Sequence, residues 1–371
     1  MRLNPIDALL FVFLKLAKAL DPRKTGQQYF DPIVIKNILV VSSTAIGDTL
    51  LSTPAIRAVR ERYPDARIIA HFNADNMELF ENNPHIDGIV PYYGGYKRFF
   101  KTIARFRKHK FDLALIFHGN EPQATPAAYL SGAPFIFKLP NVSKYGFLLS
   151  NNRQTLGWQA FKHGTDQRSA VAELADCKIK DKRMVLPISD SSAAAAQRFL
   201  QDNGVSEKDI VIGFQVGAST LSRMWFKDRF IELGKRLVDA APNLRIVLTG
   251  SPRESSYCAE IAQAIGDRAI VSSGQMALRH LPALISGFRA LVTGDTGTMH
   301  VAVAVGTPVV ALFAVADAEK SGPYYDLARH TVIQKQKICD PCASKRCEYQ
   351  RCMEAITVDE VFEAVKPLLR L

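Results

Sequence analysis

Hydrophobic positions in the first half of the chain alternate between short unbroken apolar runs and stretches with helical spacing. The run Ile38–Ser43 is rich in β-branched residues and carries no polar alternation, which is typical of a strand buried on both faces of a parallel sheet. A helix is predicted to follow over Thr49–Arg62. The later elements of this half are strands at Arg67–Phe72, Gly88–Tyr92, Leu113–Phe117 and Phe135–Leu139, with a helix at 97–110. This alternation predicts a doubly wound α/β sheet.

The pattern restarts in the second half. Residues 141–182 have no clear period and leave open a loop over a cleft or a helix without an apolar face, and 183–192 reads as a linker that ends in helix caps. The predicted strands are Ile210–Gln215, Arg245–Thr249, Ala269–Val271, Ala290–Thr293 and Val309–Phe313. The predicted helices are Ala193–Asp202, Arg229–Ala240, Ser256–Ile265, Leu281–Ser286, Met299–Val305 and Val358–Arg370. We expect four parts: an amphipathic segment (1–36), two Rossmann-like domains (37–188 and 189–354) and a C-terminal helix (355–371).

The N-terminal residues 6–20 form an apolar stretch that is too short to span a bilayer. Its lysines, Lys15 and Lys18, come late, whereas a secretory signal carries its charges first. We interpret it as an amphipathic helix that either packs on the protein or lies in a membrane interface.

Charge changes the picture by favouring an anionic partner. The 371 residues hold 47 Lys plus Arg against 36 Asp plus Glu, a net charge of +11. Nucleic acid, anionic lipid and a phosphorylated substrate all fit that surplus. In 97–110, Lys97, Lys101, Arg105 and Lys108 fall on one helical stripe, which is either a solvated face or an anion-binding face. We see no recognised nucleic-acid motif and expect no nucleic-acid partner.

Gly-Asp-Thr occurs twice, each time between a strand-like run and a helix-like one. In an open α/β sheet, ligands bind beyond the carboxyl ends of the strands. The first copy supplies Asp48, either a helix cap or a general base. Its turn lacks the three-glycine dinucleotide fingerprint, which argues against a nicotinamide cofactor.

The second copy lies in a turn with two glycines, hydroxyls and a histidine, where backbone N–H groups suit a diphosphate. A structural turn capped by Asp295 is the alternative. Residues after two other predicted strands also favour a nucleotide site. Hydroxyls donate to phosphate oxygens, arginine binds these oxygens bidentately, and glutamate accepts from ribose hydroxyls. These residues are Ser219, Thr220, Arg223 and Glu254. Together they indicate a nucleotide-diphosphate site.

Three ordered motifs carry a family resemblance. The segments 45–56, 217–225 and 293–313 resemble those of the lipopolysaccharide heptosyltransferases, glycosyltransferase family 9, over a match from about residue 37 to the C-terminus. The resemblance implies a GT-B fold of two Rossmann-like domains facing a central cleft. It also implies a nucleotide-sugar donor on the C-terminal domain, an acceptor on the N-terminal domain and inversion without a metal.

By position, the resemblance assigns Asp48 as the base that deprotonates the acceptor hydroxyl. It places Ser219, Thr220 and Arg223 on the phosphates and Glu254 at the nucleoside. The donor signature falls on Asp295, Thr296, Gly297 and His300. Two departures affect the donor site: relatives often carry lysine at the place of Arg223, and Ala314 with residues 315–323 replaces the usual glycine and Gly-Pro-Thr-Asp pattern.

Four of the six cysteines are close in sequence. Cys339, Cys342, Cys347 and Cys352 are spaced C-x2-C-x4-C-x4-C, which is compatible with free thiols, a structural zinc site or two disulfides. Reducing cytosol disfavours disulfides, and the spacing is unlike common zinc ribbons, so free thiols are the default.

The sequence therefore predicts an inverting, metal-independent transferase that moves a heptose from ADP-heptose to the inner core of lipopolysaccharide, with no cofactor besides the donor substrate. We expect a cytoplasmic enzyme peripheral to the inner membrane, with Lys97, Lys101 and Arg105 facing the anionic acceptor. The alternatives are a related enzyme with another nucleotide sugar or a protein acceptor, an epimerase-like reaction, and a non-catalytic protein that only binds nucleotide sugars.

Overall fold

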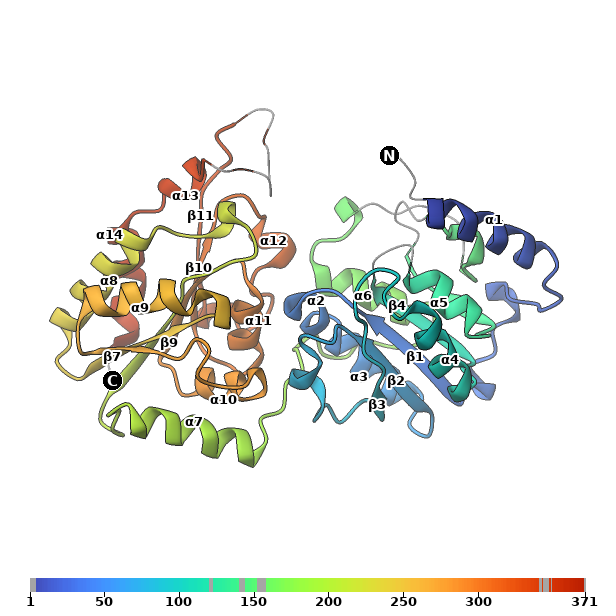
Figure 1. The fold of residues 1–371 in the computed structure, drawn as a ribbon, viewed down its shortest axis with the longest axis horizontal. Coiled ribbons are helices and arrows are strands. Elements are labelled where there is room, and N and C mark those ends of the chain that lie inside the picture. The colour runs from blue at the N-terminus through green and yellow to red at the C-terminus, as the bar shows by residue number, and fades with distance from the viewer. Residues whose placement is uncertain are drawn as a thin grey trace. The chain divides into compact units, whose positions relative to one another are not determined.

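The chain divides into two compact units, Met1–Val185 and Leu186–Leu371. The computed structural model describes residues 5–119, 123–139, 144–151, 158–339, 342, 347 and 349–369. Colour in Figure 1 runs from blue to green through unit 1 and from green to red through unit 2. Each unit is an α/β layer structure with one parallel sheet, which confirms the predicted fold class.

The sheet of unit 1 has the order β3-β2-β1-β4-β5, with all neighbours parallel. Its strands are β1 (Asn37–Ser42), β2 (Arg67–Phe72), β3 (Gly88–Ile89), β4 (Leu113–His118) and β5 (Phe135–Phe137). Strands β3 and β5 end earlier than predicted. Beyond β3, an isolated bridge joins Tyr92 to Asn73. The buried, unalternating runs of β1 and β4 explain why the sequence located them well.

The helices of unit 1 are α1 (Pro5–Ala19), α2 (Ile46–Leu50), α3 (Thr53–Arg62), α4 (Phe99–His109), α5 (Ala124–Leu130) and α6 (Gly164–Glu173). The single helix predicted over Thr49–Arg62 is wrong, because Pro54 lies in the first turn of α3 and starts a second helix there. Helix α5 was not predicted. Helix α6 occupies part of the segment in which the sequence left a loop or a helix open.

Unit 2 repeats the architecture with the strand order β11-β10-β9-β6-β7-β8. Its strands are β6 (Ile210–Gln215), β7 (Leu244–Thr249), β8 (Ala269–Val271), β9 (Ala290–Gly294), β10 (Val309–Phe313) and β11 (Thr331–Gln334). Its helices are α7 (Asp190–Asp202), α8 (Lys227–Ala240), α9 (Ser255–Ile265), α10 (Leu281–Ser286), α11 (Gly297–Ala304), α12 (Ala318–Ser321), α13 (Arg351–Glu354) and α14 (Val358–Val365). The sequence missed β11, an edge strand with no buried residue and therefore no apolar run to identify it.

Both ends of the chain pack on the unit to which they belong. Leu14 of α1 is fully buried in the same apolar cluster as α4 and α5. Val358, Val361 and Val365 of α14 are buried in the core of unit 2, as their spacing predicted. Helix α14 ends at Val365 and is followed by a 3₁₀ turn, Lys366–Leu369, while Arg370 lies outside the described residues. No helix among the described residues combines the length and the hydropathy needed to cross a bilayer.

The buried His71 makes folding sensitive to pH. Its Nδ1 lies 2.7 Å from the carbonyl oxygen of Val90, and its ring packs against Phe106 and Tyr92. The carbonyl can only accept, so Nδ1 carries the proton and donates. Burial lowers the pKa of His71 from 6.5 to about 4.

The unfolded chain therefore binds a proton at His71 between pH 6.5 and 4 that the folded protein excludes. We expect this histidine's contribution to stability to be complete above pH 6.5 and to fall by about 3 kcal/mol as the pH drops through 4. Urea unfolding at several pH values would measure it. His71→Phe should flatten the slope, and an unchanged slope in this variant would contradict the assignment.

Candidate active site

The polar side chains of unit 1 gather at the point where its strand order reverses. Strand β1 lies between β2 and β4, so the loops that follow these three strands meet at one edge of the sheet. Such a switch point is where open α/β sheets bind ligands. The Gly47-Asp48-Thr49 turn lies here, within α2 and just beyond β1.

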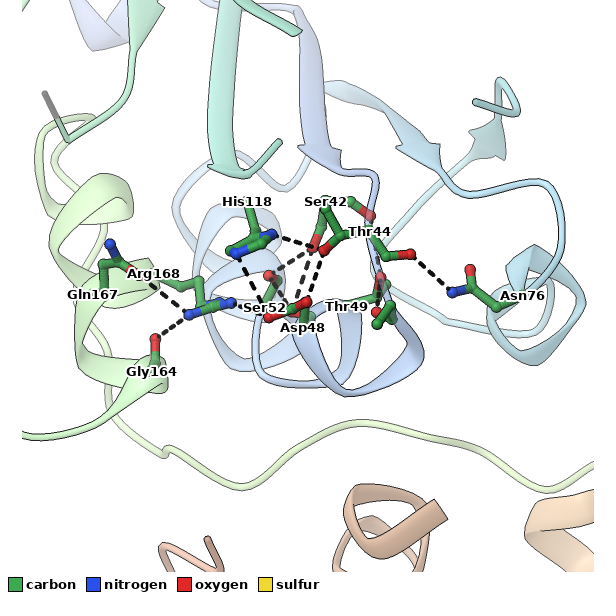
Figure 2. Close-up of polar contacts among 11 residues, drawn as sticks. Ser42, Thr44, Asp48, Thr49, Ser52, Asn76, His118, Gly164, Gln167 and Arg168 are labelled. Atoms are coloured by element: carbon green, nitrogen blue, oxygen red, sulfur yellow. Dashed lines mark hydrogen bonds and ion pairs between the residues drawn. The ribbon is translucent and has the colours of Figure 1, made fainter. Parts of the chain in front are cut away.

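Asp48 is held by side chains from three other segments (Figure 2). Its Oδ1 lies 3.0 Å from Nη2 of Arg168 and 3.6 Å from Nε2 of His118. Its Oδ2 accepts a hydrogen bond of 2.8 Å from the Thr44 hydroxyl. The helix-cap interpretation of Asp48 is not supported by these contacts, because the residue at the N-cap of α2 is Ala45. The carboxylate is instead fixed by side chains.

His118 reaches this cluster because β4 carries a bulge at its end. Val41 of β1 is opposite Ile116, but the next residue, Ser42, is opposite His118, so one residue of β4 is left over. A bulge changes the face toward which the following side chain points. Figure 2 shows the ring of His118 directed at Thr44 and Asp48. Neither His118 nor Thr44 was predicted as a site residue, and the predicted strand ended at Phe117, one residue before the histidine.

The proton positions in this cluster follow from which atoms can donate and which can accept a hydrogen bond. The Thr44 hydroxyl has one proton, which it donates to the Asp48 carboxylate. It must therefore accept from Nδ1 of His118, 2.7 Å away, so that nitrogen carries a proton. This chain of donors fixes the orientation of the Asp48 carboxylate.

Arg168 is the cationic partner of Asp48 and is almost completely buried. Its side chain is 1% exposed, whereas that of Asp48 is 32% exposed. The guanidinium also donates to the carbonyl oxygen of Gly164, 2.9 Å away within α6, and its Nε has no hydrogen-bond partner among the described residues. Burial lowers the pKa of Arg168, and the charge of Asp48 opposes that decrease.

This geometry suits proton abstraction from a hydroxyl group. The arginine and the threonine hydroxyl keep the carboxylate in one orientation, and a carboxylate accepts up to about four hydrogen bonds, so a substrate hydroxyl can also be accommodated. With a third of its surface exposed, the side chain can be reached by a ligand. Asp48 therefore has the position and the access that a general base needs.

The unequal burial of the pair predicts an unequal cost of breaking it. Asp48→Asn leaves the buried Arg168 charge without its carboxylate, which we expect to lower the free energy of unfolding by about 3 kcal/mol. Arg168→Met leaves a carboxylate that water can reach, so its cost should be smaller. Adding Arg168→Met to Asp48→Asn should then raise stability above that of Asp48→Asn alone.

Chemical unfolding of the four proteins in this cycle measures the coupling. Strictly additive losses would show that the 3.0 Å contact contributes no pairwise energy. Thr53→Ser, at a buried hydroxyl of α3 outside the cluster, serves as the control for a small change in the same unit.

The predicted donor residues of unit 2 gather at the equivalent switch point. Strand β6 lies between β7 and β9, so the loops after these three strands are neighbours. They contain Arg223, Glu254 and Asp295 respectively after β6, β7 and β9. The parallel sheet thus brings together three segments that are far apart in sequence.

Arg223 and Asp295 form an ion pair across this switch point. Nη2 of Arg223 lies 3.1 Å from Oδ2 of Asp295, and their side chains are 21% and 9% exposed. The Nε of Arg223 is buried and has no hydrogen-bond partner among the described residues. The chain passes very close here, since a Cβ atom on Gly294 would lie 2.5 Å from the carbonyl oxygen of Arg223. The glycine of the second Gly-Asp-Thr motif is required by this approach.

Thr296, not Asp295, caps helix α11. The Thr296 hydroxyl accepts from the backbone N–H of Met299 and lies 3.0 Å from the hydroxyl of Thr293. Gly297 is the first residue of α11, and His300, in the same helix, is buried. The interpretation of Asp295 as the cap is therefore wrong, because the threonine hydroxyl already fills that position. Asp295 is left to pair with Arg223.

Glu254 lies against the backbone of Gly217. A Cβ atom on Gly217 would lie 1.7 Å from Oε1 of Glu254, so a side chain at this position would displace the carboxylate from where it lies. Its Oε2 accepts from the backbone N–H and the hydroxyl of Ser251, 2.7 and 2.9 Å away. In the loop after β6, Ser219 is exposed and Thr220 is half-buried. The Thr220 hydroxyl lies 3.3 Å from the hydroxyl of Ser222. Trp225, from the same motif, is a core residue that donates to the carbonyl oxygen of Ile356.

The basic helix has the two faces that its pattern predicted. Phe99, Ile103 and Phe106 of α4 are buried, and Lys101 and Arg105 are exposed. Lys97 is exposed but precedes the helix, because Arg98 takes a left-handed conformation with φ of 60°. Lys97 is therefore not part of the helical stripe, contrary to the prediction.

The C-terminal cysteines do not gather around a common point. None of the cysteines that the structure describes is in a disulfide, and Cys339 is exposed, Cys342 and Cys347 are half-buried and Cys352 is buried. The Sγ of Cys352 accepts from the backbone N–H of Ile338. Within the described ranges, no three His, Cys, Asp or Glu side chains are arranged to hold a metal ion, so the zinc alternative gains no support.

Two parallel sheets with Rossmann strand order, each with polar side chains at its switch point, define a protein of the GT-B class. Solved structures agree. A glycosyltransferase family 9 protein from Veillonella parvula superposes with a TM-score of 0.77 at 22% identity, covering 92% of this chain and 98% of that one. The Escherichia coli ADP-heptose lipopolysaccharide heptosyltransferase II gives a TM-score of 0.75 at 23% identity, covering 90% and 98%.

Sequence comparison identifies the family. A family model described as glycosyltransferase family 9 (heptosyltransferase) matches residues 102–353. Lipopolysaccharide heptosyltransferase 2 of Escherichia coli K12 is 24% identical over 350 residues, which cover 90% of this chain and 98% of the relative. The chain therefore belongs to glycosyltransferase family 9 and is a glycosyltransferase. The matched range includes the predicted donor residues, while Asp48 precedes it.

Proposed function

We propose that this protein transfers a heptose from ADP-heptose to the inner core of lipopolysaccharide, with inversion at the anomeric carbon and without a metal ion. Membership of the heptosyltransferase family supports the reaction class. The relatives, which are named for lipopolysaccharide, support the acceptor, and the name of one solved structure supports the donor. The lipid acceptor in turn favours an enzyme peripheral to the cytoplasmic face of the inner membrane.

The observation that carries the proposal is the Asp48 carboxylate, which Arg168 and Thr44 hold at the switch point of unit 1. As base, Asp48 takes the proton of the acceptor hydroxyl while the hydroxyl oxygen bonds to the anomeric carbon. The bond from that carbon to the ADP oxygen breaks, and ADP leaves with the electron pair. One displacement from the opposite side inverts the anomeric carbon.

The departing diphosphate requires positive charge, which Arg223 and the N-terminus of α11 are suited to supply. Ser219 and Thr220 lie in the same β6 loop as Arg223 and are assigned to the phosphates. Glu254 is assigned to the nucleoside, and Asp295, Thr296, Gly297 and His300 are assigned to the donor. Preset donors of this kind stabilise the leaving group without a divalent ion.

Release of ADP from ADP-heptose by the purified protein tests this function. We expect release that depends on heptose-deficient lipopolysaccharide and persists in excess EDTA. Loss of activity in EDTA, restored by a divalent ion, would contradict metal independence. Donor binding without release would favour the non-catalytic alternative, and no binding would contradict the donor assignment.

A second candidate, transfer from another nucleotide sugar or to a protein acceptor, is favoured by the segment after β10. Ala314 is buried at the position where the family resemblance implies glycine, and α12 follows with Asp317 as its cap. This departure lies beside the donor motif. Turnover with a different nucleotide sugar, exceeding that with ADP-heptose, would favour this candidate.

A further inference from the structure

The outward side of helix α1 is an exposed apolar stripe. Its members recur at helical spacing and each is more than half exposed: Leu9 (74%), Val12 (57%), Phe13 (56%), Leu16 (62%) and, just after the helix, Leu20 (83%). Single exposed apolar residues are ordinary on soluble proteins, whereas a continuous stripe marks a surface that binds something. We call these five residues the α1 stripe.

The opposite side of α1 is fixed to unit 1. Leu14 is fully buried, and Phe11 packs against Tyr145 and Phe147 with ring centroids 5.9 and 5.5 Å away. The Tyr96 hydroxyl donates to the Asp7 carboxylate, and Nζ of Lys144 lies 3.4 Å from the Asp7 carbonyl oxygen. The helix therefore lies along the domain, and its stripe faces away from the core to which the helix is attached.

A bilayer surface is the occupant whose shape fits a helix fixed in this way. A helix of 15 residues is about 22 Å long, which is less than the hydrocarbon thickness of about 30 Å. A short helix with one apolar side lies in the plane of the interface and buries that side among the acyl chains. The other side of α1 needs no lipid, because the protein core already covers it.

Neighbouring charge indicates that the lipid is anionic. Helix α4 shares the apolar cluster of α1 through Phe99, Ile103 and Phe106, and Tyr96 links the segment before α4 to α1. No residue of α4 is acidic, and Lys101, Arg105 and Lys108 are exposed on it. Phe100, 81% exposed, adds an aromatic side chain at its first turn. Cations on a helix that shares a core cluster with α1 can complement anionic headgroups when both helices contact one lipid surface.

We propose that the α1 stripe docks unit 1 on an anionic lipid bilayer, with Lys101, Arg105 and Lys108 of α4 contacting the headgroups. This inference deepens the proposed function and rests on it for the membrane-borne acceptor. It assigns the membrane contact to named residues and gives the cations of α4 a lipid partner in addition to the acceptor assigned to them by the sequence.

Vesicle flotation tests the docking surface. The full-length protein should float with vesicles of phosphatidylethanolamine and phosphatidylglycerol. Leu9→Gln, Phe13→Gln and Leu16→Gln combined should lower the partition coefficient by about a thousandfold, because each of the three large apolar side chains contributes about tenfold when it is buried in lipid. Glutamine is a good helix former, so circular dichroism and thermal unfolding should stay unchanged. Deleting residues 1–30 is a poorer test because it also uncovers Tyr145.

A second set of substitutions tests the charge. Lys101→Gln, Arg105→Gln and Lys108→Gln combined should reduce the preference for anionic over phosphatidylcholine vesicles by about fivefold for each cation removed. Leu327→Gln is the matched control for the stripe, since Leu327 is 62% exposed like Leu16 but belongs to unit 2. This control should bind vesicles like the unaltered protein.

Failure of the unaltered protein to float, or unchanged flotation of the stripe variant, would overturn the proposal. So would a dimer that the stripe substitutions convert to a monomer without any vesicle binding, since the stripe would then join two copies of the chain. Turnover with a short soluble acceptor separates this inference from the proposed function. Flotation without turnover would refute the function alone, and turnover without flotation would refute the docking alone.

Discussion

Replacing Asp48 by asparagine should lower kcat by about 10²–10⁴-fold while leaving the KM for the nucleotide sugar nearly unchanged. Asparagine keeps the shape of the side chain but replaces one accepting oxygen by an amide group that donates, and it cannot take a proton. The predicted donor residues belong to unit 2, so donor affinity should not depend on this change. Steady-state ADP release at varied donor and acceptor concentrations measures both constants.

The buried arginine next to Asp48 complicates this experiment and also supplies its control. Asp48→Asn is expected to lose stability, because Arg168 is 1% exposed and loses its carboxylate. The double variant with Arg168→Met should regain stability but not turnover. Recovery of turnover together with stability would mean that the loss in Asp48→Asn came from unfolding, and near-normal turnover in Asp48→Asn would refute the role as base.

Arg223→Met should lower kcat by about 10²–10³-fold, the second largest effect that we expect. The methionine fills similar space but removes the charge that would stabilise the departing diphosphate. The arginine is already oriented by Asp295, 3.1 Å away, so little reorganisation is needed when the donor binds. Pre-steady-state measurement of ADP formation would show whether the chemical step is the one affected.

Arg223→Lys separates charge from geometry at this position. Because lysine keeps the positive charge, we expect Arg223→Lys to retain most of the rate that Arg223→Met loses. The recovery should be incomplete, because lysine cannot bind two oxygens in the planar manner of a guanidinium. Arg198→Met removes an exposed arginine from α7 in the same unit and should leave kcat unchanged. Equal losses in the lysine and methionine variants would show that bidentate geometry, and not charge, is what the reaction requires.

Much of the site location could be predicted because parallel strands place their carboxyl ends at one edge. The residues after β1 in unit 1 and after β6, β7 and β9 in unit 2 were identified from the apolar runs before them. Within unit 2 the strand order brings the turns after β6, β7 and β9 together. The family motifs added roles to these positions. The roles of Asp48, of the donor residues and of Lys97, Lys101 and Arg105 stay predictions until the variants are measured.

The sequence by itself determined the two parallel sheets, the positions of the buried central strands and the turns that carry Asp48 and Asp295. Short-range apolar patterning is sufficient for these, because a strand buried on both faces must be apolar throughout. Arg168 is different. It lies 120 residues from Asp48 in the sequence, on α6. The buried side of this helix includes Thr165, Gln167 and Ser169, so the sequence has no apolar period from which the helix could be predicted.

Tertiary structure alone decided which side chains surround Asp48 and which side of α1 is left uncovered. A one-residue bulge in β4 turns His118 toward Thr44. Arg168 is buried on a polar helix, where it forms an ion pair with Asp48. Both depend on contacts between distant segments, which a local pattern does not encode. The stripe on α1 is apolar on the printed sequence as well, but only packing shows that Leu14 faces the core while Leu9 and Leu16 face outward.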